Sequence, residues 1–361
     1  MKLTFWREQL QLANTWTIAR GSTNLFQVAM VELRGPDGLV GIGEASPISR
    51  YHESPATVEK FFQSVDATRL SFDDVPGSMA YLNALAPGNM SAKCALNIAL
   101  LDGAGKRANK AIYDLLGLKF RENHHVTSFS IGIDTPEVIR KKVQQAEEFP
   151  VLKLKVGVPG EREIMAALRE VAPKKPIRVD ANEGWKTKEE ALERLEWLAQ
   201  DPLIQFVEQR MPQATPVKDL KWLKERSPLP LLADESYHTA TDLKHCAECF
   251  HGVNVKLVKT GGVSAGFAAL KAARDAGLKT MIGCMIETSV LISAAAHLAE
   301  LCDFLDVDGN ILTTNDPYAG VTSKGGILSF QNAVAKTGLR VTRIAAPPTE
   351  TSAPSLATEN V

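Results

Sequence analysis

The chain has 361 residues, of which 45% are hydrophobic and 23% are charged, and its formal net charge is −1. That composition is typical of a globular protein with a large core, and it lacks the basic excess that nucleic-acid binding requires, so we expect no nucleic-acid partner. No stretch reaches the roughly 18 uncharged apolar residues of a membrane span, and residues 1–10 hold no signal-peptide core, so we expect a cytoplasmic protein without membrane contact.

The N-terminal third indicates an antiparallel sheet followed by helices. Residues 26–47, FQVAMVELRGPDGLVGIGEASP, are typical of a hairpin because two β-rich runs flank a Gly-Pro-Asp-Gly turn. Residues 91–117, SAKCALNIALLDGAGKRANKAIYDLLG, carry apolar residues at helical spacing and end in a glycine.

From about residue 125 the pattern changes to short β-rich runs separated by helix-like segments. One polar position near the end of each run recurs every 22 to 28 residues, the length of one β/α unit. Eight such units, without a phosphate-binding glycine motif, predict a closed (β/α) barrel. The positions are Ser130, Lys155, Asp180, Glu208, Asp234, Lys256, Cys284 and Asp306.

Neither the cysteines nor the C-terminal residues are predicted to take part in chemistry. The five cysteines are scattered, and Cys246 and Cys249 have metal-ligand spacing but no second pair, which favours ordinary helix cysteines over a zinc or redox site. Residues 345–361 are rich in Pro, Ser, Thr and Ala, which predicts a disordered tail.

Three carboxylates stand at the predicted ends of three consecutive strands: Asp180, Glu208 and Asp234. Catalytic residues of such barrels lie at these carboxyl ends, where the three anions would repel each other without a cation. A single carboxylate at a strand end would be interpreted as a helix cap or a solvated loop residue, but three carboxylates together indicate a Mg²⁺ site.

Lysines occupy the same kind of position on two other strands. Because side chains alternate along a strand, Lys153 and Lys155 point to the same side of the second predicted strand. Lys256 ends the sixth predicted strand, which lies across the axis of an eight-strand barrel from the second. A positive charge on Lys153 disfavours the charged form of its neighbour, which suits Lys155 to act as a base. The alternative for each is a surface ammonium or a salt bridge in the barrel, and for Lys259 that alternative is the preferred one.

Residues 1 to about 340 resemble the enolase superfamily, in its muconate-lactonizing-enzyme-like subgroup. The matching stretches, in order, are KLKVG (153–157), RVDANEGW (178–185), VEQ (207–209), ADES (233–236) and VNVKLVKTGG (253–262). The resemblance implies a (β/α)₇β TIM-like barrel, residues 123–320, under an α+β capping domain, residues 1–122. It also implies that residues 321–344 return to the cap.

The same resemblance implies an acid/base pair and a metal. Lys155 and Lys256 would transfer protons, and one Mg²⁺ per subunit would bind Asp180, Glu208 and Asp234. One lysine would remove the α-proton of a substrate carboxylate, giving a metal-stabilised enediolate, and the other would return a proton to the opposite face.

Two aspartates at the end of the eighth predicted strand restrict the set of possible reactions. Asp306 and Asp308 lie on one strand face, and two like charges at this spacing require a cation, which is then the substrate's own. An Asp-x-Asp here resembles the dipeptide epimerases, where it holds the substrate's α-ammonium group, and we expect a dipeptide substrate. The alternative is an aspartate pair that stabilises the turn before Gly309.

The remaining candidates concern specificity. Thr23 stands near the place where enzymes acting on Ala-Glu dipeptides often carry an arginine, a departure that weighs against such a substrate. Tyr51, Ser130 and Glu287 are candidate substrate contacts, with a polar loop as the alternative for Tyr51, and Lys153 is a candidate contact of the substrate carboxylate. Asn182 is expected to support the metal ligands by hydrogen bonding.

Other functions stay open at this stage. Within the same fold they are an N-acylamino acid racemase, an o-succinylbenzoate synthase or a cycloisomerase. Outside that chemistry they are a Schiff-base aldolase using Lys155 and a non-catalytic binding barrel. We also expect a homo-oligomer.

Overall fold

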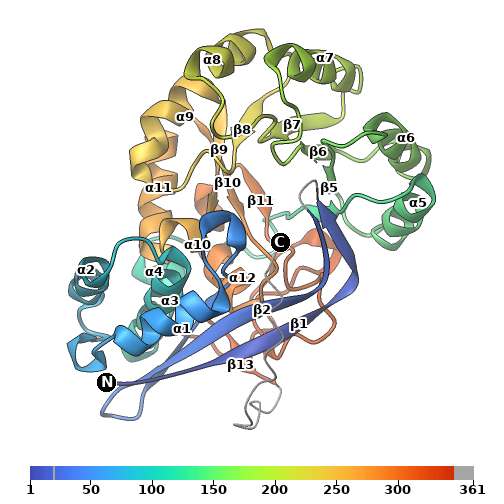
Figure 1. The fold of residues 1–361 in the computed structure, drawn as a ribbon. Helices are drawn as coiled ribbons and strands as arrows, with labels where there is room; N and C mark the ends of the chain where they lie inside the picture. Colours follow the sequence, from blue (N-terminus) through green and yellow to red (C-terminus); the bar gives the residue numbers. More distant parts are fainter. Residues whose placement is uncertain (19–20, 345–361) are drawn as a thin grey trace.

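The computed structural model of the chain describes residues 1–18 and 21–344. It begins with an antiparallel three-stranded sheet made of β1 (Lys2–Ile18), β2 (Gly21–Arg34) and β3 (Val40–Ala45) (Figure 1). The predicted hairpin is confirmed, because β2 and β3 pair from Ala29↔Ala45 to Arg34↔Val40 around a turn at residues 35–39.

Four helices follow the sheet: α1 (Pro55–Ser64), α2 (Val75–Leu85), α3 (Met90–Ala108) and α4 (Ile112–Leu115). Helices α1 and α3 pack on the sheet, and α2 and α4 pack on α3. The long helix α3 lies directly on β3, and a Cβ built on Gly43 would stand 1.9 Å from the carbonyl oxygen of Ala95. Only glycine permits this close approach. Val31, Phe62 and Leu96 belong to the core between the sheet and the helices.

Eight parallel strands form the second part of the fold, and they pair in chain order from β4 to β11. They are β4 (Phe129–Ile131), β5 (Leu152–Lys155), β6 (Ile177–Asp180), β7 (Ile204–Glu208), β8 (Leu231–Ala233), β9 (Gly252–Lys256), β10 (Lys279–Gly283) and β11 (Phe304–Asp306). A parallel bridge between Thr127 and Leu305 links the first strand to the last. The barrel and all eight predicted β-runs are therefore confirmed.

The helices between the strands form the outer ring of the barrel (Figure 1). They are α5 (Pro136–Gln145), α6 (Glu161–Val171), α7 (Lys188–Leu198), α8 (Val217–Arg226), α9 (Leu243–Cys249), α10 (Leu257–Thr260), α11 (Val263–Asp275) and α12 (Ser289–Ala296). Cys246 and Cys249 lie in α9, as expected of helix cysteines.

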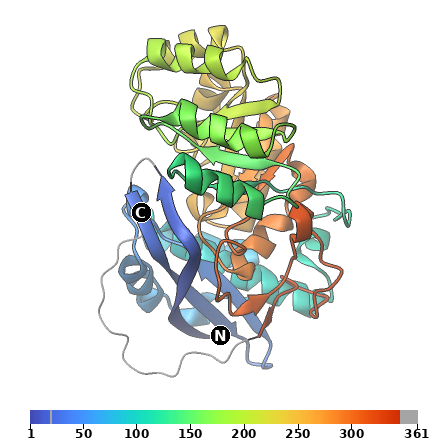
Figure 2. The same cartoon turned by 90° about the vertical axis from the view of Figure 1, so that its right-hand side faces the viewer.

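After the barrel the chain returns to the N-terminal sheet, as Figure 2 shows. The short strands β12 (Tyr318–Ala319) and β13 (Thr342–Arg343) pair with each other, and the Arg343 guanidinium lies 2.6 Å from the Glu8 carboxylate on β1. The exact domain boundaries stay a prediction, and the expected tail, residues 345–361, lies outside the described residues. Within residues 1–18 and 21–344, no helix combines the length and apolarity needed to cross a membrane.

The barrel interior changes character along the strands. Phe206, Leu232, Met281 and Phe304 form a small apolar cluster within it. Two residues further along β7 and β11, the side chains facing the same side are Glu208 and Asp306. The apolar layer closes the barrel beneath the polar one, so the site has one open end, toward the N-terminal sheet.

Candidate functional site

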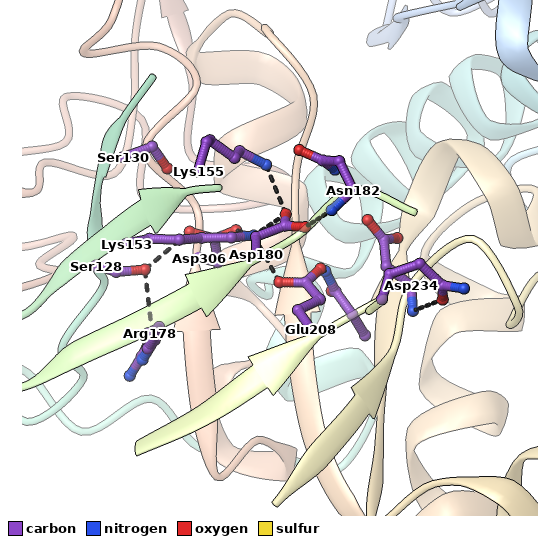
Figure 3. A network of polar contacts seen from close by, with 12 residues as sticks. Ser128, Ser130, Lys153, Lys155, Arg178, Asp180, Asn182, Glu208, Asp234 and Asp306 are labelled. Carbon is purple, nitrogen blue, oxygen red and sulfur yellow. Dashed lines mark hydrogen bonds and ion pairs between the residues drawn. The ribbon is translucent and has the colours of Figure 1, made fainter. Parts of the chain in front are cut away.

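The three predicted metal ligands come together at the carboxyl ends of β6, β7 and β8 (Figure 3). Asp180, Glu208 and Asp234 are 0%, 0% and 1% exposed, and each offers a carboxylate oxygen within 4.8 Å of the other two. Such a buried, all-oxygen donor set fits Mg²⁺.

Neighbouring groups fix the orientation of these carboxylates. The backbone N–H of Asn182 donates to Asp180 Oδ1 (2.9 Å), and the Asn254 amide donates to Glu208 Oε1 (2.7 Å). Gly283 makes room for that amide, because a Cβ there would lie 2.6 Å from Asn254 Oδ1. These contacts hold two carboxylates from behind and leave their other oxygens for the cluster.

Lys155 and Lys256 approach the cluster from opposite sides. Their strands, β5 and β9, are four positions apart in the order of eight, which places them across the barrel axis. Lys155 Nζ lies 2.6 Å from Asp180 Oδ2, and Lys256 Nζ lies 2.9 Å from Asp234 Oδ2. Both ammonium groups therefore reach the same end of the barrel.

Lys153 lies deeper, among carboxylates. Its Nζ is 2.6 Å from Asp306, 2.7 Å from Glu208 and 3.2 Å from Asp180. Burial opposes the charge, but the carboxylates raise the pKa of Lys153 well above its usual value. The surrounding carboxylates thus favour the protonated form of Lys153.

The metal-site carboxylates differ among themselves in their electrostatics. Burial works against ionisation of Asp180, yet Lys155 and Lys153 lower its pKa to about 2. For Glu208 burial prevails over Lys153 and raises the pKa to about 8. Burial also opposes ionisation of Asp234, but Lys256 and Lys259 lower its pKa well below the usual value. Three close carboxylates therefore ionise only with cationic help, which four lysines supply in part.

The two aspartates on and after β11 line the same cavity. Asp306 accepts hydrogen bonds from Ser128 Oγ (2.8 Å) and Lys153 Nζ (2.6 Å). Asp308 accepts one from the backbone N–H of Ser130 (2.7 Å), and burial together with Asp306 raises its pKa to about 6.

The cavity at the barrel mouth is closed on one side by the N-terminal part of the chain. Its lining there consists of Trp16, Ile18, Phe26, Ile48 and Tyr51. Lys155 Nζ lies 5.9 Å from the centroid of the Trp16 ring, so this indole covers one of the two opposed lysines. Apart from the Tyr51 hydroxyl and the Trp16 N–H, these side chains are apolar.

Some predicted contacts line the cavity and others do not. Ser130, Tyr51 and Asn182 are part of its lining. Among the residues described, Thr23 and Glu287 are not: the Thr23 hydroxyl donates to Leu25 O (2.7 Å), and Glu287 accepts from the Met285 N–H (2.9 Å). A role for either in substrate binding stays a prediction.

Several site residues were absent from the sequence interpretation. Ser128, Arg178 and Asn254 each stand two residues before a predicted strand-end residue, so strand alternation was the signal that would have found them. Lys259 is buried and donates to Asp234 Oδ1 (2.6 Å), which is the salt-bridge alternative weighed above.

Comparison with known proteins finds two matching family models. The mandelate racemase / muconate lactonizing enzyme N-terminal domain matches residues 2–117, and the enolase C-terminal domain-like model matches residues 138–315.

Named relatives cover nearly the whole chain. An L-Ala-D/L-amino acid epimerase of Pedosphaera parvula is 63% identical over 344 residues, which are 94% of this chain and 99% of the relative. An L-Ala-D/L-Glu epimerase of Bacteroides thetaiotaomicron is 35% identical, covering 92% of this chain and 86% of the relative. The crystal structure of a dipeptide epimerase from Enterococcus faecalis, complexed with Mg and L-Leu-L-Tyr, superimposes with a TM-score of 0.86 at 29% identity, covering 94% of this chain and 99% of that chain.

Proposed function

This chain belongs to the mandelate racemase/muconate lactonizing enzyme family of the enolase superfamily and is an isomerase, and from that premise we propose that it is a dipeptide epimerase. It inverts the α-carbon of the C-terminal residue of a dipeptide whose first residue is L-alanine. The observation that carries the proposal is the pair of buried lysines on opposite strands, each against a carboxylate of one acidic cluster. The names of the relatives support the substrate.

Asp180, Glu208 and Asp234 would hold one Mg²⁺ per subunit. When bound, the ion supplies positive charge that stabilises negative charge developing on a substrate carboxylate. The support for Mg²⁺ is the buried donor set of this chain and the Mg in the Enterococcus faecalis structure.

The proton transfers fall to the two opposed lysines. With the substrate's α-carbon between them, a neutral amine at Nζ of one lysine accepts the α-proton. The ammonium at Nζ of the other lysine donates a proton to the opposite face, which inverts the centre. Either lysine serves as the base, depending on which epimer is bound, so the reaction is reversible.

Other side chains orient the substrate between the lysines. Lys153, which lies beside the cluster and lines the cavity, binds the substrate carboxylate. The cavity end at Asp306 and Asp308 receives the α-ammonium group, the one further charge of a dipeptide backbone. The apolar side chains of the N-terminal part exclude water from the reacting carbon.

The experiment is incubation of the protein in D₂O with Mg²⁺ and a panel of L-Ala-Xaa dipeptides, with N-succinylated and N-acetylated amino acids as the rival substrates. Mass spectrometry and chiral chromatography measure deuterium at the α-carbon and the epimer formed. We expect one deuterium per molecule in the C-terminal residue of dipeptides. Exchange confined to N-acyl amino acids would contradict the dipeptide substrate and indicate an N-acylamino acid racemase. Exchange that persists in EDTA would contradict the requirement for Mg²⁺.

A further inference from the structure

Three residues that follow two of the predicted metal ligands hold a left-handed backbone although none of them is a glycine. Asn182 (φ 41°) and Glu183 (φ 65°) come shortly after Asp180, and Gln209 (φ 34°) comes directly after Glu208. Residues with a side chain disfavour this conformation, and it persists where surrounding contacts hold it. The loops after β6 and β7 therefore depend on contacts that fix their shape.

The loops after β5, β6 and β7 pack against each other at the mouth of the barrel. The Glu183 N–H donates to the carbonyl oxygen of Gln209 (2.8 Å), which joins the loop after β6 to the loop after β7. On the other side, a Cβ built on Gly184 would lie 2.4 Å from the Cα of Gly157, so the loops after β5 and β6 touch backbone to backbone. A displacement of one loop is therefore felt by the next.

One buried carboxylate bonds to two of these loops at once. Glu161, the first residue of α6, is 4% exposed, and its Oε2 accepts hydrogen bonds from the Gly157 N–H (3.0 Å) and the Trp185 indole N–H (3.2 Å). Its Oε1 lies 2.8 Å from Arg194 Nε on α7. Among the residues described, neither Glu161 nor these three partners line the cavity at the barrel mouth, so Glu161 can influence the reaction only through the loops.

The contacts of Glu161 favour one of the two opposed lysines. Gly157 stands two residues after Lys155, so a shift of the loop after β5 is passed to this lysine over a short length of backbone. Lys256 ends β9 on the other side of the barrel, and the partners of Glu161 belong to the loops after β5 and β6 and to α7. Loss of Glu161 should therefore displace Lys155 and leave Lys256 in place.

We propose that Glu161 is a positioning residue for Lys155: by holding the loop after β5 against the loop after β6, it sets where the Lys155 amine meets the substrate's α-carbon. The inference rests on the proposed function and deepens it, because the two lysines then differ in what holds them. The reach of the Glu161 side chain to both loops is what matters in this role, and its charge is secondary.

Exchange of the α-proton in D₂O with Mg²⁺, followed by NMR for each epimer of an L-Ala-Xaa dipeptide separately, tests this asymmetry. The epimer that a Lys155→Met variant no longer exchanges marks the face that Lys155 serves. For Glu161→Ala we expect exchange of this epimer to fall about 30-fold, because a misplacement of about 1 Å suffices for such a loss, and exchange of the other epimer to stay within about threefold of the wild type. A role in folding or metal binding alone would lower both equally.

Two conservative variants separate reach from charge and carry the test if Glu161→Ala does not fold. Glu161→Asp keeps the charge but is one methylene shorter, and we expect about a tenfold loss of exchange for the epimer served by Lys155. Glu161→Gln keeps an acceptor oxygen at full reach, and its amide nitrogen faces Arg194, whose side chain is 27% exposed. We expect Glu161→Gln to retain exchange of both epimers within about threefold of the wild type.

Glu163→Gln, an exposed position on the same turn of α6, is the matched control, and thermal melts of all variants check folding. Equal losses for the two epimers in Glu161→Ala or Glu161→Asp would overturn the inference. So would unchanged exchange in Glu161→Asp, or a loss in Glu161→Gln as large as in Glu161→Asp. These outcomes leave the proposed function intact, whereas a wild type that exchanges no dipeptide refutes the proposed function and the inference together.

Discussion

Lys153 has three carboxylates around its ammonium group, whereas Lys155, two residues further along the same strand, has one. The two side chains point to one side of β5, yet only the deeper one contacts Asp306 on β11 and Glu208 on β7, each two strands away in the barrel. Lys153 therefore holds carboxylates in place, and Lys155 is the lysine of this strand to which we assign proton transfer in the proposed function.

At the residue scale the carboxylate cluster makes a direct prediction about metal binding. Because Asp180, Glu208 and Asp234 are buried close together, a divalent cation relieves their repulsion and stabilises the folded state. At Mg²⁺ a hundredfold above its Kd, we expect a gain of about 2.7 kcal/mol, measured as a rise in Tm. Asp180→Asn should abolish the rise, and Asp275→Asn on α11 should leave it intact. A Tm independent of Mg²⁺ and of EDTA would contradict the metal site.

Six of the eight strand-end residues were predictable from sequence because a charged residue ends a β-rich run. Their supports were less visible. Asn254, Ser128 and Arg178 each lie two residues earlier, so strand alternation gives the side on which they lie but not the groups that they contact on other strands. The pairing of Lys153 with Asp306 joins residues 153 positions apart, and no local pattern contains it.

At the scale of elements, a short helix of the N-terminal part is fastened to a barrel loop. The 3-10 helix Ser49–Tyr51 carries Arg50, whose Nη2 lies 3.1 Å from Glu183 Oε1 and whose Nε lies 3.2 Å from Oε2. Glu183 holds a left-handed backbone (φ 65°) directly after Asn182, and Tyr51 lines the cavity. The ion pair therefore fixes the loop that covers the site.

Arg50→Ala should loosen this loop without unfolding the protein. The pair is partly exposed, so its contribution to stability is about 1 kcal/mol or less, which corresponds to at most about a fivefold rise in KM. Steady-state kinetics and thermal melts measure the two effects. The exposed pair of Arg34 with Glu32 supplies the control, Arg34→Ala. An unchanged KM for Arg50→Ala would show that the loop is held by other contacts.

At the scale of the whole molecule, β3 is joined to the barrel by a buried carboxylate. Glu44 is 0% exposed and accepts hydrogen bonds from the Thr288 N–H (2.8 Å), the Thr288 hydroxyl (2.6 Å) and the Leu291 N–H (3.1 Å) at the start of α12. Burial raises its pKa from 4.5 to about 8 despite these donors. The hairpin that contains Glu44 was predicted from the sequence, but no local pattern indicates that this carboxylate joins the two parts of the fold.

Because the pKa of Glu44 is raised, the stability of the contact between β3 and the barrel depends on pH. The folded state binds a proton at Glu44 that the unfolded state has released between pH 4.5 and about 8, so this group lowers stability as the pH rises through that window. Glu44→Gln keeps hydrogen-bonding groups at the position and does not titrate. We therefore expect the Tm of Glu44→Gln, relative to the Tm of the wild type, to be higher at pH 8 than at pH 5.

Thermal melts at the two pH values measure this gain, with the exposed Glu248→Gln on α9 as the control. A Tm difference between Glu44→Gln and wild type that is constant with pH would mean that Glu44 does not titrate in this window.

The central claim is that Lys155 and Lys256 move protons on opposite faces of one α-carbon, and stereospecific exchange tests it most directly. Lys155→Met and Lys256→Met are each incubated in D₂O with the two epimers of a dipeptide separately, and NMR follows the α-proton; Lys271→Met on α11 is the control. We predict that each variant loses epimerisation by about 10³-fold or more yet still exchanges the α-proton of one epimer, a different one for each lysine. Exchange of the same epimer by both variants, or epimerisation that survives either change, would contradict the account.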